Sequence, residues 1–234
     1  MTLLLIPGFM LDDALWDDML PFLSAHDVRF AALGGGATIE AMAQAVLAHA
    51  PSTFVLLGFS MGGYVAREIA RLAPARVTAL VLVATSSRPD QPDMVRQRVA
   101  AARQAAATTT FHGLSRGAIR ASLHPGRHGD AAMIERVRAM GERLGRDAFL
   151  RQSAVVRSGD AATLDRIHCP TLVIGADGDQ LRSVDEMREL AAGIPGAELA
   201  IVAGSGHMIP LEAPQQLGQL VTRWLAKAGA GAAR

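Results

Sequence analysis

One serine of this chain stands in a pattern that can turn its hydroxyl into a nucleophile. Residues 58–62 read Gly-Phe-Ser-Met-Gly, a G-x-S-x-G pattern with Ser60 at its centre. The apolar run Phe54–Leu57 precedes it, and apolar residues recur at helical spacing from Met61 onward. A strand that turns into a helix this quickly strains the central residue and requires small neighbours two positions away on each side. The pattern therefore predicts a sharp turn that projects the Ser60 hydroxyl above a sheet.

A serine hydroxyl attacks a carbonyl carbon only when a base removes its proton, and the chain has seven histidines that could do so. His207 lies in a Gly-rich loop directly after the expected strand Ala197–Val202, at the sheet edge where Ser60 is also expected. The other six end helices, lie in the middle of the chain or precede a strand at the opposite edge: His26, His49, His112, His124, His128 and His168. We therefore expect His207 to be the general base; the alternative is an ordinary loop histidine.

The histidine in turn needs an acid that orients it. Two carboxylates, Asp177 and Asp179, follow the expected strand Thr171–Gly175, and the glycine between them lets the loop turn. We favour Asp179 as the orienting acid, and Asp177 is then solvated or bonded to the loop backbone. Glu212 is interpreted as a charge at the start of the last helix. The expected chain order is serine, aspartate, histidine.

The oxyanion of a tetrahedral intermediate needs two preorganised N–H donors. Met61, directly after the serine, is expected to supply one from the start of its helix. Phe9 is expected to supply the other, because Gly8 in the turn after the first strand allows the backbone to approach closely. Met10 and Met208 fall near the same place, and flexible methionines there either line a pocket for an acyl or alkyl group or belong to the core.

Apolar strands and amphipathic helices alternate along most of the chain, and these elements must position the side chains above. The expected strands are 3–6, 28–33, 54–57, 77–84, 171–175 and 197–202. The expected helices between and after them are 12–24, 39–50, 61–73, 183–192 and 214–228. This alternation predicts an α/β fold, with a mostly parallel sheet of about six strands covered by helices on both faces.

The alternation breaks at Ser86. Residues 86–166 contain helical stretches and no convincing strand, so we predict a helical cap, 86–166, inserted after the strand that ends near Ala84 into a core of residues 1–85 and 167–234. This insertion holds 14 of the 23 basic residues, all of them arginine, against 8 of the 22 acidic residues. It is either a solvated arginine-rich surface or a basic lid that favours an anionic acyl carrier or a carboxylate substrate.

Composition narrows the class of protein. The formal net charge is only +1, which argues against a nucleic-acid or membrane-surface binder, and no window has the length of a membrane span. Cys169 is the single cysteine, so we expect no intrachain disulfide and interpret it as a buried apolar residue. His124 and His128 are separated by Pro-Gly and do not share a helical face, so no metal and no cofactor are expected. The amino-terminal segment lacks the features of a signal peptide, which predicts a cytoplasmic location.

Four segments together resemble a known family: Leu-Leu-Ile-Pro-Gly-Phe at 4–9, Gly-Phe-Ser-Met-Gly-Gly-Tyr at 58–64, Pro-Thr-Leu-Val-Ile-Gly-Ala-Asp-Gly-Asp at 170–179, and Gly-Ser-Gly-His-Met-Ile-Pro-Leu-Glu-Ala-Pro at 204–214. The chain is similar to α/β-hydrolase-fold enzymes of the esterase, thioesterase and C–C hydrolase group. Small bacterial pimeloyl-ACP methyl ester carboxylesterase-like members are particularly similar. The resemblance implies a nucleophile elbow, an oxyanion hole and a Ser-Asp-His triad, and it supports Asp179 as the acid.

The chain departs from the family pattern in three places. Pro7 stands where a histidine usually precedes the oxyanion glycine, and the segment after the second strand is shortened to Leu33-Gly-Gly-Gly. The chain also begins at what would be the family's third strand, which implies a sheet of about six strands. Because the shortened segment often shapes the substrate entrance, substrate specificity does not carry over from the family.

The residues and the resemblance together predict a serine hydrolase that cleaves a carboxylic ester or thioester. The same three residues could instead serve C–C bond hydrolysis, acyl transfer or cofactor-free perhydrolysis. A ligand-binding protein without catalysis is a third class of function. The expected partner is a small-molecule ester or thioester, with an anionic or carrier-linked substrate as the sharper alternative.

Overall fold

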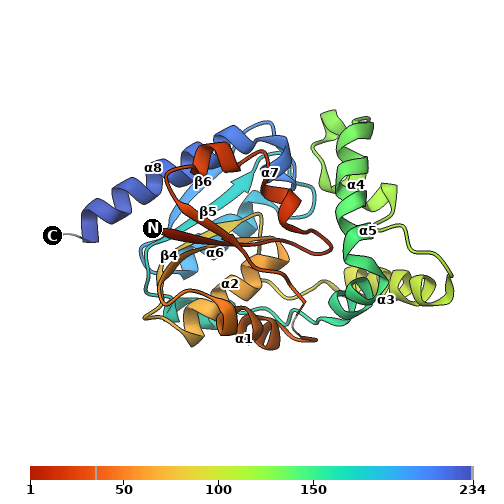
Figure 1. Cartoon of the computed structure of the whole chain (residues 1–234), viewed down its shortest axis with the longest axis horizontal. Coiled ribbons are helices and arrows are strands. Elements are labelled where there is room, and N and C mark those ends of the chain that lie inside the picture. The colour runs from red at the N-terminus through yellow and green to blue at the C-terminus, as the bar shows by residue number, and fades with distance from the viewer. Residues whose placement is uncertain (35, 233–234) are drawn as a thin grey trace.

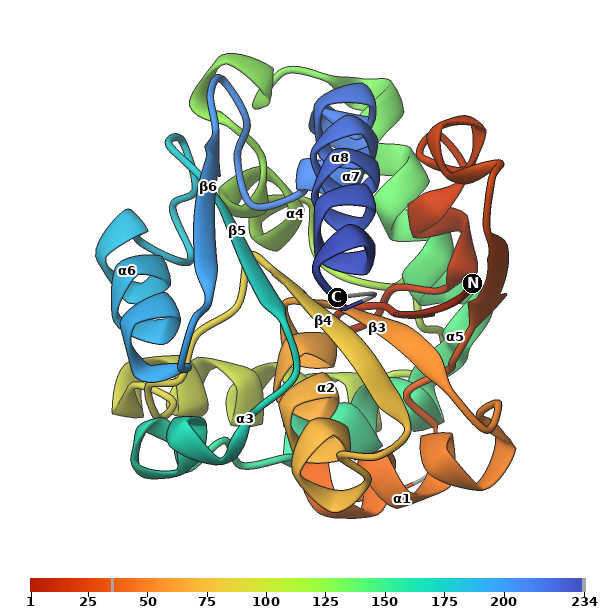
Figure 2. The ribbon, with the colours of Figure 1, turned by 90° about the vertical axis from the view of Figure 1, so that its left-hand side faces the viewer.

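A computed structural model describes residues 1–34 and 36–232 of the chain. Its centre is a six-stranded sheet in the order β2-β1-β3-β4-β5-β6, and each neighbouring pair is parallel. The strands run side by side with a twist (Figure 2). Their bounds are β1 Thr2–Ile6, β2 Asp27–Phe30, β3 Phe54–Phe59, β4 Val77–Val83, β5 Thr171–Ala176 and β6 Glu198–Val202. The prediction of a parallel sheet of about six strands is confirmed.

Helices cover both faces of the sheet because its strands are apolar on both sides. Leu3 and Leu5 of β1 pack into one core cluster with Trp16 and Leu217, whereas Leu4 packs into a second cluster on the opposite face. The second cluster also holds side chains of α1 Ile39–His49, α2 Met61–Leu72 and α6 Val184–Gly193, and the first holds side chains of α8 Pro214–Ala232. Successive side chains of a strand point to opposite faces, so the two cores follow from the strand period.

Two local predictions are wrong. The helix expected over 12–24 is two short 3₁₀-helices, Asp13–Trp16 and Leu20–Leu23. Pro21 explains the break, since proline lacks the N–H that a continuous helix would need there. The strand expected over 28–33 ends at Phe30, whose partner Leu5 is the last residue of β1 that pairs with β2.

The segment between β4 and β5 is helical, as predicted. It contains α3 Pro92–Ala107, α4 Arg116–Ser122 and α5 Ala131–Ala154, with short 3₁₀-helices at Pro125–Arg127 and Ala161–Arg166. Gly145 interrupts α5 with a φ of 79°. Helices α3, α4 and α5 stand together beside the sheet (Figure 1), and we call residues 86–166 the cap. Their role as a separate cap unit remains a prediction.

Among the helices of the described residues, none combines the length and the apolar character needed to cross a membrane.

Candidate active site

Ser60 sits in the sharp turn between β3 and α2. Its φ of 51° and ψ of −114° are a strained conformation for a residue with a side chain. Gly58 and Gly62 have no room for a side chain, because a Cβ on Gly58 would collide with the Gly62 backbone and one on Gly62 would collide with the Pro7 carbonyl. The turn is held from outside as well, since the Ser60 N–H donates to Val83 O at 2.9 Å. This geometry is the nucleophile elbow that the G-x-S-x-G pattern predicts.

The structure brings Ser60, His207 and Asp179 into one line of hydrogen bonds. His207 Nε2 lies 3.0 Å from Ser60 Oγ, and His207 Nδ1 lies 2.8 Å from Asp179 Oδ2. The histidine and aspartate side chains are only 6% and 1% exposed. Asp179 is itself fixed, because its Oδ1 accepts hydrogen bonds from the backbone N–H groups of Leu181 at 2.7 Å and Arg182 at 2.9 Å.

This arrangement sets the tautomer of the histidine. A carboxylate accepts and cannot donate, so the His207 Nδ1–H must donate to Asp179. In the neutral ring Nε2 is then left without a proton and faces the Ser60 hydroxyl as an acceptor. Asp177, the alternative acid, does not contact the histidine and instead accepts a hydrogen bond from the Gly204 N–H at 2.8 Å. The geometry therefore favours Asp179 over Asp177.

Phe9 and Met61 are placed where their N–H groups can face a carbonyl oxygen held at Ser60. Met61 is the first residue of α2, so its N–H has no acceptor within the helix. Gly8 brings the Phe9 turn close, because a Cβ on Gly8 would lie 3.2 Å from the Ser60 Cβ. Neither N–H donates to another residue in the described part of the chain. Their role as the oxyanion hole remains a prediction that this geometry supports.

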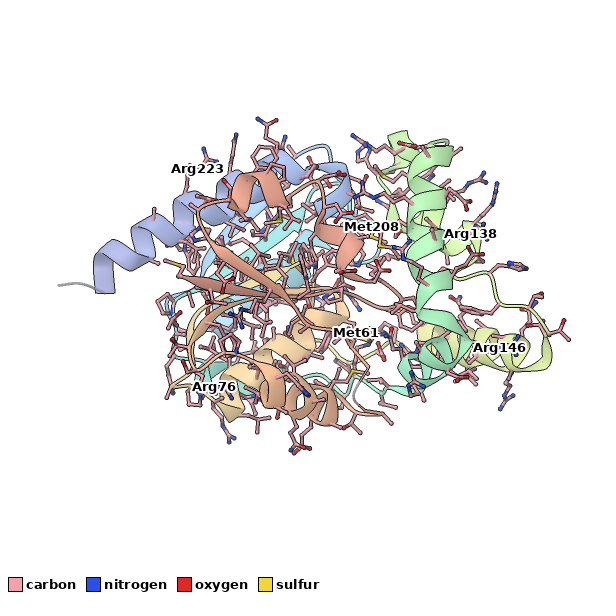
Figure 3. All side chains as sticks on the ribbon, in the orientation of Figure 1. Met61, Arg76, Arg138, Arg146, Met208 and Arg223 are labelled. Carbon is pink, nitrogen blue, oxygen red and sulfur yellow. The ribbon has the colours of Figure 1, made fainter. Side chains whose placement is uncertain are left out.

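A cavity of about 1270 Å³ opens between the core loops and the cap, and Ser60 and His207 lie in its wall. Phe9 and Met208 line it as well, and Figure 3 shows Met208 on the side of the core that faces the cap. Met10 is fully buried and packs with cap residues in a core cluster, so the structure favours the core over the pocket for this methionine.

Gln152 of the cap joins two core loops, and no sequence pattern pointed to it. Its Oε1 accepts a hydrogen bond from the Met10 N–H at 2.8 Å, and its Nε2 donates to Leu33 O at 3.2 Å. The side chain is buried, and Met10 directly follows the expected oxyanion donor Phe9. Gln152 is therefore placed to fix the turn that carries Phe9.

The change Gln152→Leu is expected to lower kcat by about tenfold to a hundredfold and to change KM less. The reason is that a misplaced oxyanion donor weakens binding of the transition state more than binding of the substrate. Steady-state kinetics on a neutral ester would measure this, with Gln216→Leu on the exposed face of α8 as the control. A kcat equal to that of the parent protein would show that the Phe9 turn does not depend on Gln152.

The sequence interpretation of Glu212 as a charge at the start of the last helix is wrong, because its side chain is buried. The short helix α7 Ile209–Glu212 folds its carboxylate back beneath the His207 loop. Oε1 accepts from the N–H groups of Gly206 at 3.1 Å and Met208 at 3.2 Å, and Oε2 accepts from the N–H of His124 in the cap at 2.8 Å. One carboxylate thus holds both neighbours of His207 and the adjoining part of the cap.

Glu212→Leu is expected to lower the free energy of unfolding by about 3 kcal/mol or more, because it leaves the backbone N–H groups of Gly206 and His124 without an acceptor. The N–H of Met208 keeps only its longer hydrogen bond to Ser122 O, at 3.3 Å. Urea denaturation would measure the change. The matched control is Glu189→Leu, which removes a carboxylate from an exposed ion pair with Arg88 and is expected to leave stability nearly unchanged. Equal effects of the two changes would contradict the structural role of Glu212.

Comparison with known proteins agrees with this fold. Residues 36–214 match the family model described as the alpha/beta hydrolase fold, which is most of the chain. The chain belongs to the alpha/beta hydrolase fold family. This alpha/beta hydrolase is 28% identical over 253 residues to a pimeloyl-(acyl-carrier protein) methyl ester esterase of Aromatoleum aromaticum, covering 94% of this chain and 96% of the relative.

Comparison with solved structures also finds an esterase and another hydrolase. A thermophilic esterase from Thermogutta terrifontis, described as malate bound, is 27% identical with a TM-score of 0.82, and the match covers 97% of this chain and 90% of that one. A hydrolase from Pseudomonas aeruginosa is also 27% identical, with a TM-score of 0.81 over 96% of this chain and 89% of that one. Esterases are therefore among the relatives of this alpha/beta hydrolase in both sequence and structure.

Proposed function

We propose that the chain is a serine hydrolase that cleaves a carboxylic ester or thioester through an acyl-enzyme on Ser60. The observation that carries this proposal is the line of hydrogen bonds from Asp179 through His207 to Ser60, at 2.8 Å and 3.0 Å, in the wall of a large cavity. A hydroxyl, an unprotonated imidazole nitrogen and a buried carboxylate in this order are what acyl transfer to serine requires.

In the first half of the reaction, Ser60 Oγ attacks the carbonyl carbon while His207 Nε2 takes the hydroxyl proton. The oxygen of the tetrahedral intermediate becomes an anion, and the N–H groups of Phe9 and Met61 stabilise it. His207 then gives the proton to the leaving alcohol or thiol, and the acyl group stays on Ser60. Asp179 stabilises the imidazolium that forms between these two proton transfers.

In the second half, water takes the place of the leaving group. His207 Nε2 removes a proton from the water as its oxygen attacks the acyl carbonyl, and the same two N–H groups stabilise the second oxyanion. Collapse of this intermediate releases the carboxylic acid, and the proton returns to Ser60 Oγ. This second half breaks the bond between the acyl carbon and Ser60 Oγ. Over the whole reaction, the substrate bond that is cleaved is the one between the acyl carbon and the leaving oxygen or sulfur.

The cavity supports an anionic or carrier-linked substrate. Five arginines belong to its lining and no aspartate or glutamate does: Arg98, Arg116, Arg138, Arg157 and Arg182. An excess of positive charge in a cleft raises the local concentration of anionic ligands. The Aromatoleum aromaticum relative is named for a carrier-linked methyl ester, and the Thermogutta terrifontis esterase is described with bound malate, a dicarboxylate.

Partitioning of a common intermediate tests the acyl-enzyme. Two esters with the same acyl group and different alcohols are hydrolysed in the presence of added methanol, and the ratio of methyl ester to free acid is measured. A single acyl-enzyme on Ser60 predicts the same ratio from both substrates. A ratio that depends on the original alcohol would mean that water attacks the substrate directly, and the proposal would then be wrong.

A further inference from the structure

Three arginines on the cavity wall lie close enough to repel one another. Arg98 and Arg157 come from the cap, and Arg182 comes from the loop after β5, yet all three line the cavity that holds Ser60 and His207. Their side chains are only 12%, 10% and 10% exposed. Guanidinium groups this buried require negative charge nearby, because transfer of an unpaired charge from water into a protein is costly.

The two carboxylates that pair with these arginines do not balance their three positive charges. Asp90 serves two of the arginines, accepting from Arg98 Nη2 at 2.8 Å and from Arg157 Nε at 2.7 Å. Glu186 lies 3.4 Å from Arg182 Nη1, a long contact, while its other oxygen is used to cap helix α6. Three guanidinium charges therefore share two carboxylates, and Arg182 is the least completely paired.

The lowered pKa of Arg157 agrees with this shortage of negative charge. Burial lowers the pKa of Arg157 from its ordinary value, and the positive charges of Arg98 and Arg182 lower it further, although the neighbouring Asp90 opposes them. A bound anion would relieve this repulsion. The outer arginine Arg138 (Figure 3) has no such need, because carboxylates on both sides pair with it.

The least completely paired arginine, Arg182, is directly connected to the proposed catalytic residues. The backbone N–H of Arg182 donates to Asp179 Oδ1 at 2.9 Å, and the other oxygen of the same carboxylate holds His207. Arg182 is thus joined to the histidine through a single carboxylate. The Arg182 side chain and Ser60 also line the same cavity, so one bound molecule can place an anion at the guanidinium and an ester group in the cavity of Ser60.

We propose that Arg157 and Arg182 form a subsite for a carboxylate on the substrate, so that carboxylate-bearing esters are the preferred substrates. This inference rests on the proposed ester hydrolysis and adds a substrate class to it. A carboxylate accepts two parallel hydrogen bonds from one guanidinium. Within the described residues only Nη1 of the Arg182 guanidinium donates to a partner, which leaves its Nε and Nη2 N–H groups for such a ligand. The carboxylate can be on the acyl side, as in a half-ester of a dicarboxylic acid, or on the alcohol side, as in an ester of a hydroxy acid.

Matched substrate pairs test the subsite. The first series is the p-nitrophenyl half-esters of succinic, glutaric, adipic and pimelic acids, each compared with the same ester in which the free carboxylate is a carboxamide. The second series is acetyl esters of hydroxy acids of increasing length, compared with their amides. For the best pair we expect kcat/KM to be about tenfold to a hundredfold higher for the carboxylate, the range of a charge-assisted hydrogen bond.

Variants of the protein then show which arginine causes the preference for the carboxylate. Arg182→Met is expected to lower kcat/KM for the carboxylate much more than for the carboxamide, and so to abolish the preference. A merely structural role would instead lower both values alike and leave the preference in place. The control is Arg188→Met, which removes an exposed arginine that pairs with Asp185 in the following helix α6. It is expected to leave the preference unchanged. Equal rates for both members of every pair in the parent protein, or a preference that survives Arg182→Met, would overturn the subsite.

Inhibition gives an independent reading if Arg182→Met loses all activity. The dicarboxylate matching the best half-ester is expected to inhibit hydrolysis of a neutral ester by the parent protein competitively, and its diamide at least tenfold more weakly. Equal inhibition would overturn the subsite. If folded parent protein hydrolyses no ester, the proposed function fails instead. Calorimetric titration with the same dicarboxylate and diamide then decides the subsite separately, with tighter binding of the dicarboxylate supporting it and equal binding overturning it.

Discussion

Replacing Ser60 with alanine is expected to lower kcat by about 10⁴-fold to 10⁶-fold, the range found when the nucleophile of a Ser-His-Asp site is removed. Alanine lacks the Oγ that lies 3.0 Å from His207 Nε2, so no acyl-enzyme can form. The fold is expected to remain, because alanine is smaller than serine and the elbow already holds a residue with a Cβ at a φ of 51°. Steady-state hydrolysis and urea denaturation would measure the two effects.

A residual rate within tenfold of the parent would contradict the role of Ser60. Ser52→Ala is a suitable control, because Ser52 is an exposed serine before the start of β3, at the opposite end of that strand from Ser60. It is expected to keep full activity. A large loss of stability in Ser60→Ala would instead mean that the hydroxyl supports the elbow, and the kinetic loss would then need a second explanation.

Asp179→Asn is expected to lower kcat by about 10⁴-fold, with KM changed much less. An asparagine can present its amide N–H to the histidine, which favours the tautomer with the proton on Nε2. His207 then points a donor at Ser60 Oγ and cannot accept the serine proton. The geometry allows this change with little rearrangement, because an amide oxygen can still accept the N–H groups of Leu181 and Arg182.

Asp177→Asn is the matched control for that change. It removes one carboxylate charge from the same loop, and its amide oxygen can still accept the hydrogen bond from the Gly204 N–H. We expect kcat within a few-fold of the parent protein. The ratio of the two variants measures which aspartate orients the histidine, and a larger effect of Asp177→Asn would contradict the assignment.

The positions of the proposed catalytic residues could be predicted from sequence because each follows a strand. Strands β3, β5 and β6 are short apolar runs, and the carboxyl ends of parallel strands meet at one edge of a sheet. Ser60, Asp179 and His207 lie just beyond these ends, so local patterns were enough to bring them together. Phe9 likewise follows the end of β1.

The supporting contacts could not be predicted, because they join segments that are distant along the chain. Gln152 contacts Met10 and Leu33 across more than 100 residues, and a single glutamine on a cap helix carries no pattern of its own. Glu212 is close to His207 in sequence. Its role depends on a four-residue helix that turns its carboxylate inward, and sequence alone shows only an acid before a proline.

The pairing of the arginines could not be predicted from sequence either. Sequence revealed an excess of arginine in residues 86–166, but not which arginines are paired. In the structure, Arg138 pairs with two carboxylates of its own helix. Arg182, which lies outside residues 86–166, is the least completely paired of the three buried arginines that line the cavity. Composition predicted the sign of the charge near the site, and only tertiary packing locates it.

Intact-mass analysis after treatment with a fluorophosphonate tests the central claim most directly, because such probes react with an activated serine and barely with an ordinary hydroxyl. We expect one covalent adduct on the parent protein, none on Ser60→Ala, and almost none on His207→Ala, in which Ser60 keeps its hydroxyl but has no base. An unmodified, folded parent protein, or an adduct that persists in Ser60→Ala, would contradict the role of Ser60 as an activated nucleophile.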